Sequence, residues 1–400
     1  MKINRQAVRV FSLGVLCFQG FGVRIFDGII PGAIILWTFI LLLLNWRSVK
    51  SMPVNKWGVF IGIIIFYLVF CKIKNVQPAL FVFAAWVSAF IILSNYWRGQ
   101  HSFIYDLSRL GRFCMWYSLL HIPIMLFLKS ALITTSFNMQ PKTFLYLFYF
   151  NNGEGFMGMP RIQGFCWEPS CWNLLLNINL VFTLYFKRPL KDLALSIISI
   201  VSVFATTGLV VMVGVIAAYY LLNLSRKKAL RTIFLFTIVM AILAPFVYGQ
   251  LQDKLSTGSG NARMGDFAIA AAIAKESPLL GADLDNITTN KIAIKARINA
   301  WTTEQGDYEG YMEQGMTNAF ASLIVEWGCV LFILIIYLLL KTPLLPDKKL
   351  RIVFMVALLG VLMGTPISRT GFFYLFVFST LVCYKPSMRK ASNAVTQYNQ

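Results

Sequence analysis

Long apolar runs alternate with short polar segments along the whole chain. Two of the clearest, Pro78–Tyr96 and Thr317–Leu340, extend for about 20 residues with almost no charge, which is the length that an α-helix needs to cross the hydrocarbon core of a bilayer. These runs are continuously apolar, whereas the strands of a membrane β-barrel alternate between apolar and polar residues. The pattern predicts about twelve spanning helices, at residues 8–24, 28–45, 58–71, 78–97, 113–129, 169–186, 193–206, 208–223, 232–249, 318–340, 352–366 and 371–384.

The composition supports the same class of protein. Hydrophobic residues make up 58% of the 400 positions and charged residues 13%, far below the roughly one quarter that is usual in a soluble domain. The first apolar run, Val8–Val23, follows basic residues like a secretory signal, but it has no small-x-small cleavage site and a second span follows it. We therefore expect an all-α fold, a polytopic transmembrane helical bundle whose first helix is not removed.

The formal charge of +20 is distributed unevenly along the chain. With the N-terminus inside, the excess of Lys and Arg falls on alternate connections such as Ser225–Arg231 and Lys341–Arg351, as the positive-inside rule requires. This assignment predicts a bacterial inner-membrane protein with both termini in the cytoplasm. It also accounts for the basic charge without a nucleic-acid partner.

One long apolar run, Leu193–Leu222, fits either a single tilted helix or two short ones. Basic residues flank both of its ends, so both ends are expected on the cytoplasmic side. We therefore expect the chain to cross twice here, with a turn at Thr206-Thr207-Gly208.

Two of the predicted outer connections, Ser130–Glu168 and Gln250–Thr317, are long. Long loops are the place where a membrane enzyme keeps its polar chemistry. They divide the chain into an N-terminal five-helix membrane part (1–129), a first periplasmic loop (130–168), central membrane helices (169–249), a large periplasmic loop (250–317), and C-terminal membrane helices with a cytoplasmic tail (318–400).

The first loop ends with two charged residues, Arg161 and Glu168, at the rim of the next span. Pro169 suits the first turn of that helix, which puts Glu168 at the helix N-terminus. An arginine binds phosphate oxygens through its planar fork, and a carboxylate accepts a proton from an attacking hydroxyl, so the pair suits transfer from a lipid pyrophosphate. The alternative is an ion pair or a headgroup anchor. The aromatic run Phe144–Phe150 fits an interface belt or, less often, a surface for stacking sugars.

The second loop predicts a turn at Ser256–Asn261 and an Ala-rich helix at Arg263–Lys275, ended by Ser277-Pro278. Arg263 lies close to Gly258 and Gly260 at the opening of this helix, where it would add positive charge at the same phosphates; the alternative is a solvated loop residue. In the segment Lys291–Trp301, which contains Arg297, the spacing of apolar residues does not distinguish a helix from a strand, and we interpret the segment as an interfacial helix.

Glu326 lies inside a predicted span, where a carboxylate usually faces a polar cavity or a partner. The sequence contains no Walker loop, HExxH or GxSxG motif and no cluster of metal ligands. Its seven cysteines show no paired CxxC spacing. We therefore expect no metal and no cofactor, and no ATP, zinc or serine-hydrolase chemistry.

Several short motifs follow one another in a characteristic order. They are Arg161-Ile-Gln-Gly164 followed by Glu168-Pro169-Ser170, Thr206-Thr207-Gly208, Gly258–Arg263, Pro278–Asn286, and Asn318 through Gly328. In this order, and with the long late outer loop, the chain resembles the O-antigen polymerase and ligase superfamily, the Wzy-like membrane glycosyltransferases of bacterial surface-polysaccharide assembly.

The resemblance implies metal-independent transfer of a glycan from undecaprenyl pyrophosphate to a sugar hydroxyl on a second lipid-linked unit, at the periplasmic face. In this interpretation Arg161 and Arg263 hold the pyrophosphate and Glu168 assists the acceptor hydroxyl. Substrate-binding positions are assigned to Gly164, Gly258, Gly260, Arg297, Asn318 and Glu326. Membrane lipid, a chain-length regulator and a flippase are the further partners that it suggests.

Ligases of this superfamily carry a histidine in the large loop near the return helix, and this loop has none. We therefore expect a polymerase of O-antigen, capsule or exopolysaccharide repeat units. The alternatives are a polysaccharide ligase and, from a different class, a polysaccharide or lipid transporter, which would use charged residues within spans.

Overall fold

The computed structural model describes residues 4–21, 30–74, 80–98, 100–136, 140–154, 159–223, 258–283, 287–300 and 316–383, and these are mostly helical. The predicted span at 232–249 lies outside the described residues. Each of the other predicted spans overlaps a helix. These helices are α1 (Arg5–Phe21), α2 (Ile30–Lys50), α3 (Val54–Lys74), α4 (Leu80–Leu93), α5 (Gln100–Phe127), α6 (Pro169–Tyr185), α7 (Leu190–Val201), α8 (Thr206–Asn223), α13 (Ala319–Leu340), α14 (Lys348–Leu362) and α15 (Gly371–Val382).

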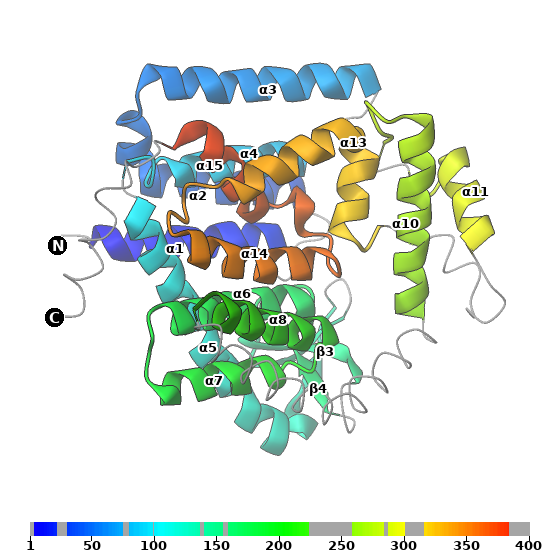
Figure 1. The fold of residues 1–400 in the computed structure, drawn as a ribbon. Coiled ribbons are helices and arrows are strands. Elements are labelled where there is room, and N and C mark those ends of the chain that lie inside the picture. Colours follow the sequence, from blue (N-terminus) through cyan, green and yellow to red (C-terminus); the bar gives the residue numbers. More distant parts are fainter. Residues whose placement is uncertain are drawn as a thin grey trace.

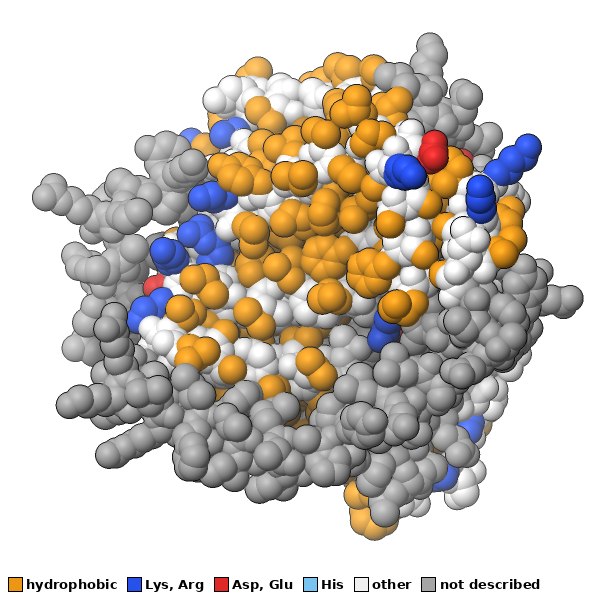
Figure 2. All heavy atoms as spheres, turned by 45° about the vertical axis from the view of Figure 1, so that its right-hand side comes forward, with side chains coloured by type: hydrophobic (Ala, Val, Ile, Leu, Met, Phe, Trp, Pro, Cys, Tyr) orange, Lys and Arg blue, Asp and Glu red, His pale blue; other side chains and the backbone are white. Residues whose placement is uncertain are grey.

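Within the described residues, three segments are long and apolar enough to cross a membrane by length and composition: Ser102–Phe127, Thr206–Asn223 and Ala319–Leu340. Other apolar helices, such as Val82–Leu93 and Gly371–Val382, are shorter. The larger bundle of about twelve spans therefore stays a prediction. Figure 2 shows one face of the molecule on which hydrophobic side chains cover a broad area, with Lys and Arg at its left edge and again at its upper right.

Helix α6 forms the centre of one half of the bundle and packs between α5, α7, α8 and α14 (Figure 1). Every residue from Pro169 to Leu184 is buried, as expected for a helix that is surrounded on all sides. Helix α15 has the same role in the other half, where it packs against α4 and α13. Glu168 therefore begins the most enclosed helix of its half.

Helices α10 (Gly258–Glu276) and α11 (Lys291–Ala300) stand at one end of the bundle, at the right of Figure 1. Ile269 and Ile273 of α10, Ala293 of α11 and Val325 of α13 belong to a second, smaller core. Strands β3 and β4 lie toward the same end (Figure 1). Parts of both long loops thus meet one end of the helical bundle.

The prediction of an all-α fold is wrong for the first loop, which contains a four-stranded antiparallel sheet in the order β1-β2-β3-β4. Phe144 pairs with Phe148, so the aromatic run forms a hairpin, and Leu145 and Tyr146 at its tip have positive φ angles. The run has no alternation and no Gly, Asn or Pro at the tip, so the usual hairpin signals are missing. The strands are β1 (Ile133–Thr134), β2 (Lys142–Phe144), β3 (Phe148–Glu154) and β4 (Pro160–Ile162).

The apolar run Leu193–Leu222 does form two helices, α7 and α8. The connection between them falls at residues 202–205, immediately before the predicted turn Thr206-Thr207-Gly208, which forms the start of α8. Helix α13 also differs from a continuous span, because Gly328 has φ 71° and ψ 172° and breaks it.

Candidate functional site

A tight turn brings Arg161 of β4 close to the start of α6. Within this turn Cys166 N donates to Gln163 O at 3.1 Å. Gly164 has φ +57°, and a Cβ there would lie 2.3 Å from Trp172 Cδ2, so another residue would have to push the indole away. Gly164, predicted to bind substrate, thus lets the turn rest directly on α6.

Glu168 is the N-cap residue of α6, with extended backbone and no capping hydrogen bond from its side chain. The positive end of the helix dipole favours its charged form. Burial lowers the pKa of Arg161, and the Glu168 carboxylate opposes this shift. The structure therefore brings the predicted pair into one electrostatic unit, in which the buried Nε of Arg161 has no hydrogen-bond partner among the described residues.

A second group of predicted residues meets at the turn after α14. Arg263 Nη2 lies 3.4 Å from Gly364 O, and Asn318 Nδ2 donates to the preceding carbonyl, Met363 O, at 3.1 Å. Asn318 also caps α13, because its Oδ1 accepts from Phe320 N and Ala321 N. Arg263 and Asn318 thus fix the same turn from two sides.

The local setting of Arg263 differs from the prediction. Helix α10 begins at Gly258, so the turn expected at Ser256–Asn261 is at least in part helical and Arg263 lies inside the helix instead of opening it. A glycine in a helix interior, such as Gly265, weakens the helix by about 1 kcal/mol, and packing of Ile269 and Ile273 against α11 and α13 opposes that cost. Gly258 and Gly260 lie in the first turn of α10.

Asp266, which the sequence interpretation missed, ties α10 to the start of α13. Its Oδ2 accepts from Thr317 N and Thr317 Oγ1, both at 2.7 Å, and from Asn318 N at 2.9 Å. Burial raises the pKa of Asp266, while these hydrogen bonds and the charge of Arg297 oppose the shift. Arg297 is itself buried, at 3% exposure. Its charge acts on the Asp266 carboxylate.

Glu326, whose partner the sequence left open, pairs with Arg369. The guanidinium Nη2 lies 3.1 Å from Oε1, and Nε lies 3.2 and 3.3 Å from the two carboxylate oxygens. Arg369 belongs to the short 3-10 helix η4 (Ile367–Arg369). The pair links α13 to the segment between α14 and α15.

The break in α13 is filled by the glycine turn of the large loop. Ala282 N donates to Val325 O at 2.6 Å, and Cys329 N donates to Pro278 O at 2.7 Å. A Cβ at Gly281 would lie 2.1 Å from Val325 O, and one at Gly328 would lie 2.6 Å from Pro278 O. The loop thus satisfies the backbone groups that the broken helix leaves open, as buried backbone requires.

A row of polar residues on α6 connects the two groups of charged residues. Asn177 Nδ2 donates to Gly208 O at 3.2 Å, and neither polar atom of the buried Asn173 side chain has a hydrogen-bond partner in the described protein. Gly208 packs on Asn173, and Gly364 packs on Thr207 and Arg263. A chain of contacts therefore runs from the Gly164 turn through α6 and α8 to Arg263.

The asparagines of α6 carried a signal that the sequence interpretation did not use. Asn173 and Asn177 are four residues apart, on one helix face, within an apolar run, and polar residues within a span usually face the protein interior.

Comparison with known protein families finds no matching family model, and comparison with curated proteins finds no similar sequence.

Proposed function

We propose that this chain is a membrane glycosyltransferase that polymerises surface-polysaccharide repeat units, using undecaprenyl pyrophosphate as the leaving group at the outer face of the bacterial inner membrane. The observation that carries the proposal is Arg161, a largely buried cation whose Nε has no hydrogen-bond partner among the described residues, beside Glu168 at the N-terminus of α6. A largely buried guanidinium whose Nε is unpaired within the described protein, next to a carboxylate, suits an anionic leaving group and an attacking hydroxyl.

The membrane setting of the proposal is supported by the three long apolar helices and by the charge bias of the connections. Parts of both long loops lie toward the same end of the bundle (Figure 1), which is consistent with one outer site between them. The charge bias of the connections favours the periplasmic side for that end.

In the proposed step the acceptor hydroxyl attacks the anomeric carbon of the donor sugar. A new glycosidic C–O bond forms, the bond to the pyrophosphate oxygen breaks, and the hydroxyl proton passes to the Glu168 carboxylate. The pyrophosphate leaves with the bonding electron pair, and Arg161 and Arg263 stabilise the negative charge that develops on it. The chain of contacts through α6 and α8 would hold these residues at a fixed spacing.

Lipid-linked glycans from cells that lack this chain distinguish the two transferase hypotheses. A polymerase predicts that single lipid-linked repeats accumulate. A ligase predicts that long polymer accumulates without attachment to its acceptor. Normal chain length and normal attachment would contradict both.

The roles of the residues are tested in purified protein supplied with lipid-linked repeats. If each arginine contributes a charge-assisted contact of about 1.5–3 kcal/mol, Arg161→Ala or Arg263→Ala should lower turnover about tenfold to two-hundredfold. Arg161→Lys should recover part of the loss, because it keeps the charge but not the planar fork. Glu168→Gln should lower turnover while donor affinity stays nearly unchanged.

Lys142→Ala is the matched control, because it removes a cation from strand β2 of the same sheet, which β3 separates from Arg161 on β4. It should leave turnover unchanged at the same protein level. Full activity of both Arg161→Ala and Arg263→Ala would mean that the arginines anchor lipid headgroups and that the site is misassigned.

A transporter is the second candidate, and the broken helix α13 with its Glu326–Arg369 pair favours it, because discontinuous helices and intramembrane charges are common at transport sites. Against it, the backbone groups at the break are already bonded to the 278–282 loop. Movement of a lipid-linked glycan across proteoliposomes without any change in glycan length would support the transporter.

A further inference from the structure

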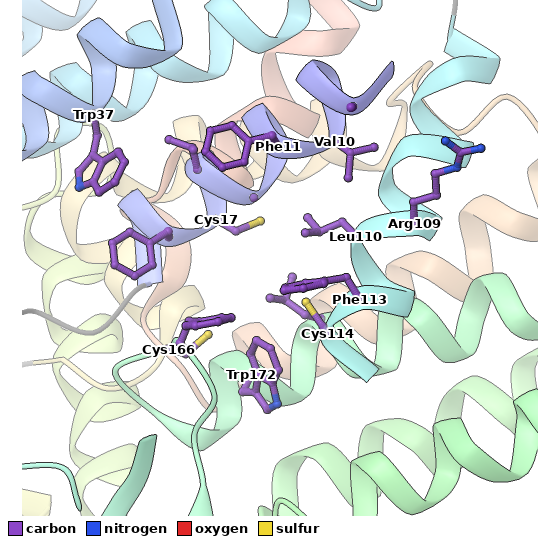
Figure 3. A pocket seen from close by; sticks show the side chains of 16 residues that line it. Val10, Phe11, Cys17, Trp37, Arg109, Leu110, Phe113, Cys114, Cys166 and Trp172 are labelled. Atoms are coloured by element: carbon purple, nitrogen blue, oxygen red, sulfur yellow. The ribbon is translucent and has the colours of Figure 1, made fainter. Parts of the chain in front are cut away.

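An apolar groove of about 650 Å³ lies between α1, α2, α5 and α6 (Figure 3). Its walls are mainly aromatic rings, aliphatic side chains and thiols, including Phe11 and Phe18 of α1, Trp37 of α2 and Phe113 of α5. Phe11 and Phe113 are more than half exposed, so the groove opens on the side of the helical bundle. A groove of this kind on a spanning bundle faces hydrocarbon.

One end of the groove is built by the turn that carries the proposed active site. Phe165 and Cys166 line the groove and lie in the chain between Arg161 and Glu168. Trp172, on which the turn rests through Gly164, also lines it. Arg109 is the only charged residue among the described lining residues, and it lies at the end opposite to Cys166 (Figure 3).

We infer that this groove holds the polyprenyl chain of the lipid-pyrophosphate donor, an inference that rests on the proposed function. The hydrocarbon chain is bonded directly to the pyrophosphate. When the pyrophosphate is held by Arg161, the first isoprene units must leave along an adjoining apolar surface, and Phe165 and Cys166 provide it. Arg161 thus faces the pyrophosphate and the groove receives the hydrocarbon tail, and both are reached from the turn between Arg161 and Glu168.

Gly14 widens the groove on the side of α1. Gly14 of α1 lines the groove, and a Cβ placed there would meet only Leu110 Cδ1, at 3.6 Å. The missing side chain leaves room beside the α1 backbone. A polyprenyl chain carries a methyl group on every unit and so fills more width than a straight acyl chain does.

The groove should orient the donor more than it attracts it. A tail that moves from the bilayer into the groove exchanges one apolar environment for another, so little hydrophobic free energy is gained. The remaining gain comes from fixing the direction in which the pyrophosphate approaches Arg161. We therefore expect a long-chain donor to have a KM about tenfold lower than a donor with a geranyl chain.

The substitution Gly14→Phe tests this assignment, because Gly14 lines the groove, a Cβ there meets only Leu110 Cδ1, and the larger side chain would take up groove volume. It should raise the KM of the long-chain donor to that of the geranyl donor and leave the geranyl reaction unchanged. Gly58→Phe is the matched control, because a Cβ at Gly58 of α3 meets nothing within 4 Å; it should keep the preference. If Gly14→Phe keeps the preference for the long chain, or weakens both donors equally, the tail lies elsewhere.

A binding measurement separates this inference from the proposed reaction. A polyprenyl pyrophosphate with a diazirine on its chain should label peptides of α1 and α5 in the wild-type protein and lose that labelling in Gly14→Phe. Unlabelled polyprenyl pyrophosphate should compete, and excess phospholipid should not. Equal competition by phospholipid would overturn the inference, whereas labelling without any polymerisation of either donor would overturn the proposed function alone.

Discussion

Replacement of Gly328 by alanine should undo the docking of the large loop onto α13. The φ of 71° and ψ of 172° place Gly328 in a backbone region that only glycine adopts readily, and a side chain there costs about 1–3 kcal/mol. The new Cβ would also lie 2.6 Å from Pro278 O, which forces the loop or the helix to move.

The total loss can be worked out from the groups that separate. If α13 straightens, the bonds from Ala282 N to Val325 O and from Cys329 N to Pro278 O are both lost, at about 1 kcal/mol each. Cys329 N and Val325 O then pair within the helix, which returns part of that loss, while straightening avoids the backbone strain at position 328, so we expect a destabilisation of about 1–2 kcal/mol. Glu326 would turn with the helix and leave Arg369.

Thermal unfolding of the detergent-solubilised protein measures this effect, with Gly58→Ala as the control in open space. Gly328→Ala should lower the apparent melting temperature by several degrees, and protease cleavage within 278–282 should become faster. Polymerisation should fall as well, because the loop that carries Arg263 loses its anchor. A Gly328→Ala protein as stable and as protected as the control would show that the loop does not depend on the break.

Three further predictions follow from the site. Burial raises the pKa of Asp266 in the folded protein above its value in the unfolded chain. The stability that the protonated Asp266 contributes is therefore fully present below the pKa of the unfolded chain and is lost as pH rises through the pKa of the folded protein. Asp266→Asn should flatten this part of the dependence of unfolding free energy on pH, and an unchanged curve would contradict the assignment. Glu326→Gln should destabilise by about 1–3 kcal/mol because Arg369, whose side chain is 20% exposed, loses its contact with the carboxylate, and Glu326→Gln with Arg369→Gln should recover much of the loss; additive effects of the two single substitutions would mean that the pair is not coupled. Alkaline phosphatase fused after Glu276 should be active and fused after Lys348 inactive, and the reverse would end the case for a periplasmic site.

The helix positions could be predicted because each depends on a local apolar run. The start of α6 is the sharpest case: Pro169 lacks the N–H that a first helical turn leaves unpaired, and the helix does begin there. The division of the run Leu193–Leu222 into two helices, α7 and α8, was also predictable, because flanking basic residues decided between one helix and two.

The features that escaped prediction depend on partners far away in the sequence. Gly328 breaks α13 only because the 278–282 loop bonds to the exposed backbone groups, and the local sequence gives no sign of that loop. The same holds for Asp266, which caps Thr317 and Asn318 from another helix. The strands β1, β2 and β4 are too short to show an alternating pattern.

The described acids divide four arginines that are predicted to lie on the outer side into two kinds. Arg369 is held by Glu326 in a two-oxygen pair, and the charge of Arg297 is balanced in part by Asp266. These two already have carboxylate partners and stabilise the fold.

The other two cations are in a different state. Arg263 reaches a neutral carbonyl, Gly364 O, at the long distance of 3.4 Å. Arg161 is influenced by Glu168, yet its Nε lacks a hydrogen-bond partner among the described residues. A bound pyrophosphate would supply the anionic oxygens that these two guanidinium groups lack. Of these four arginines, Arg161, with an Nε unpaired in the described protein, and Arg263, with its long contact to a carbonyl, are therefore the two that the sequence interpretation assigned to the leaving group.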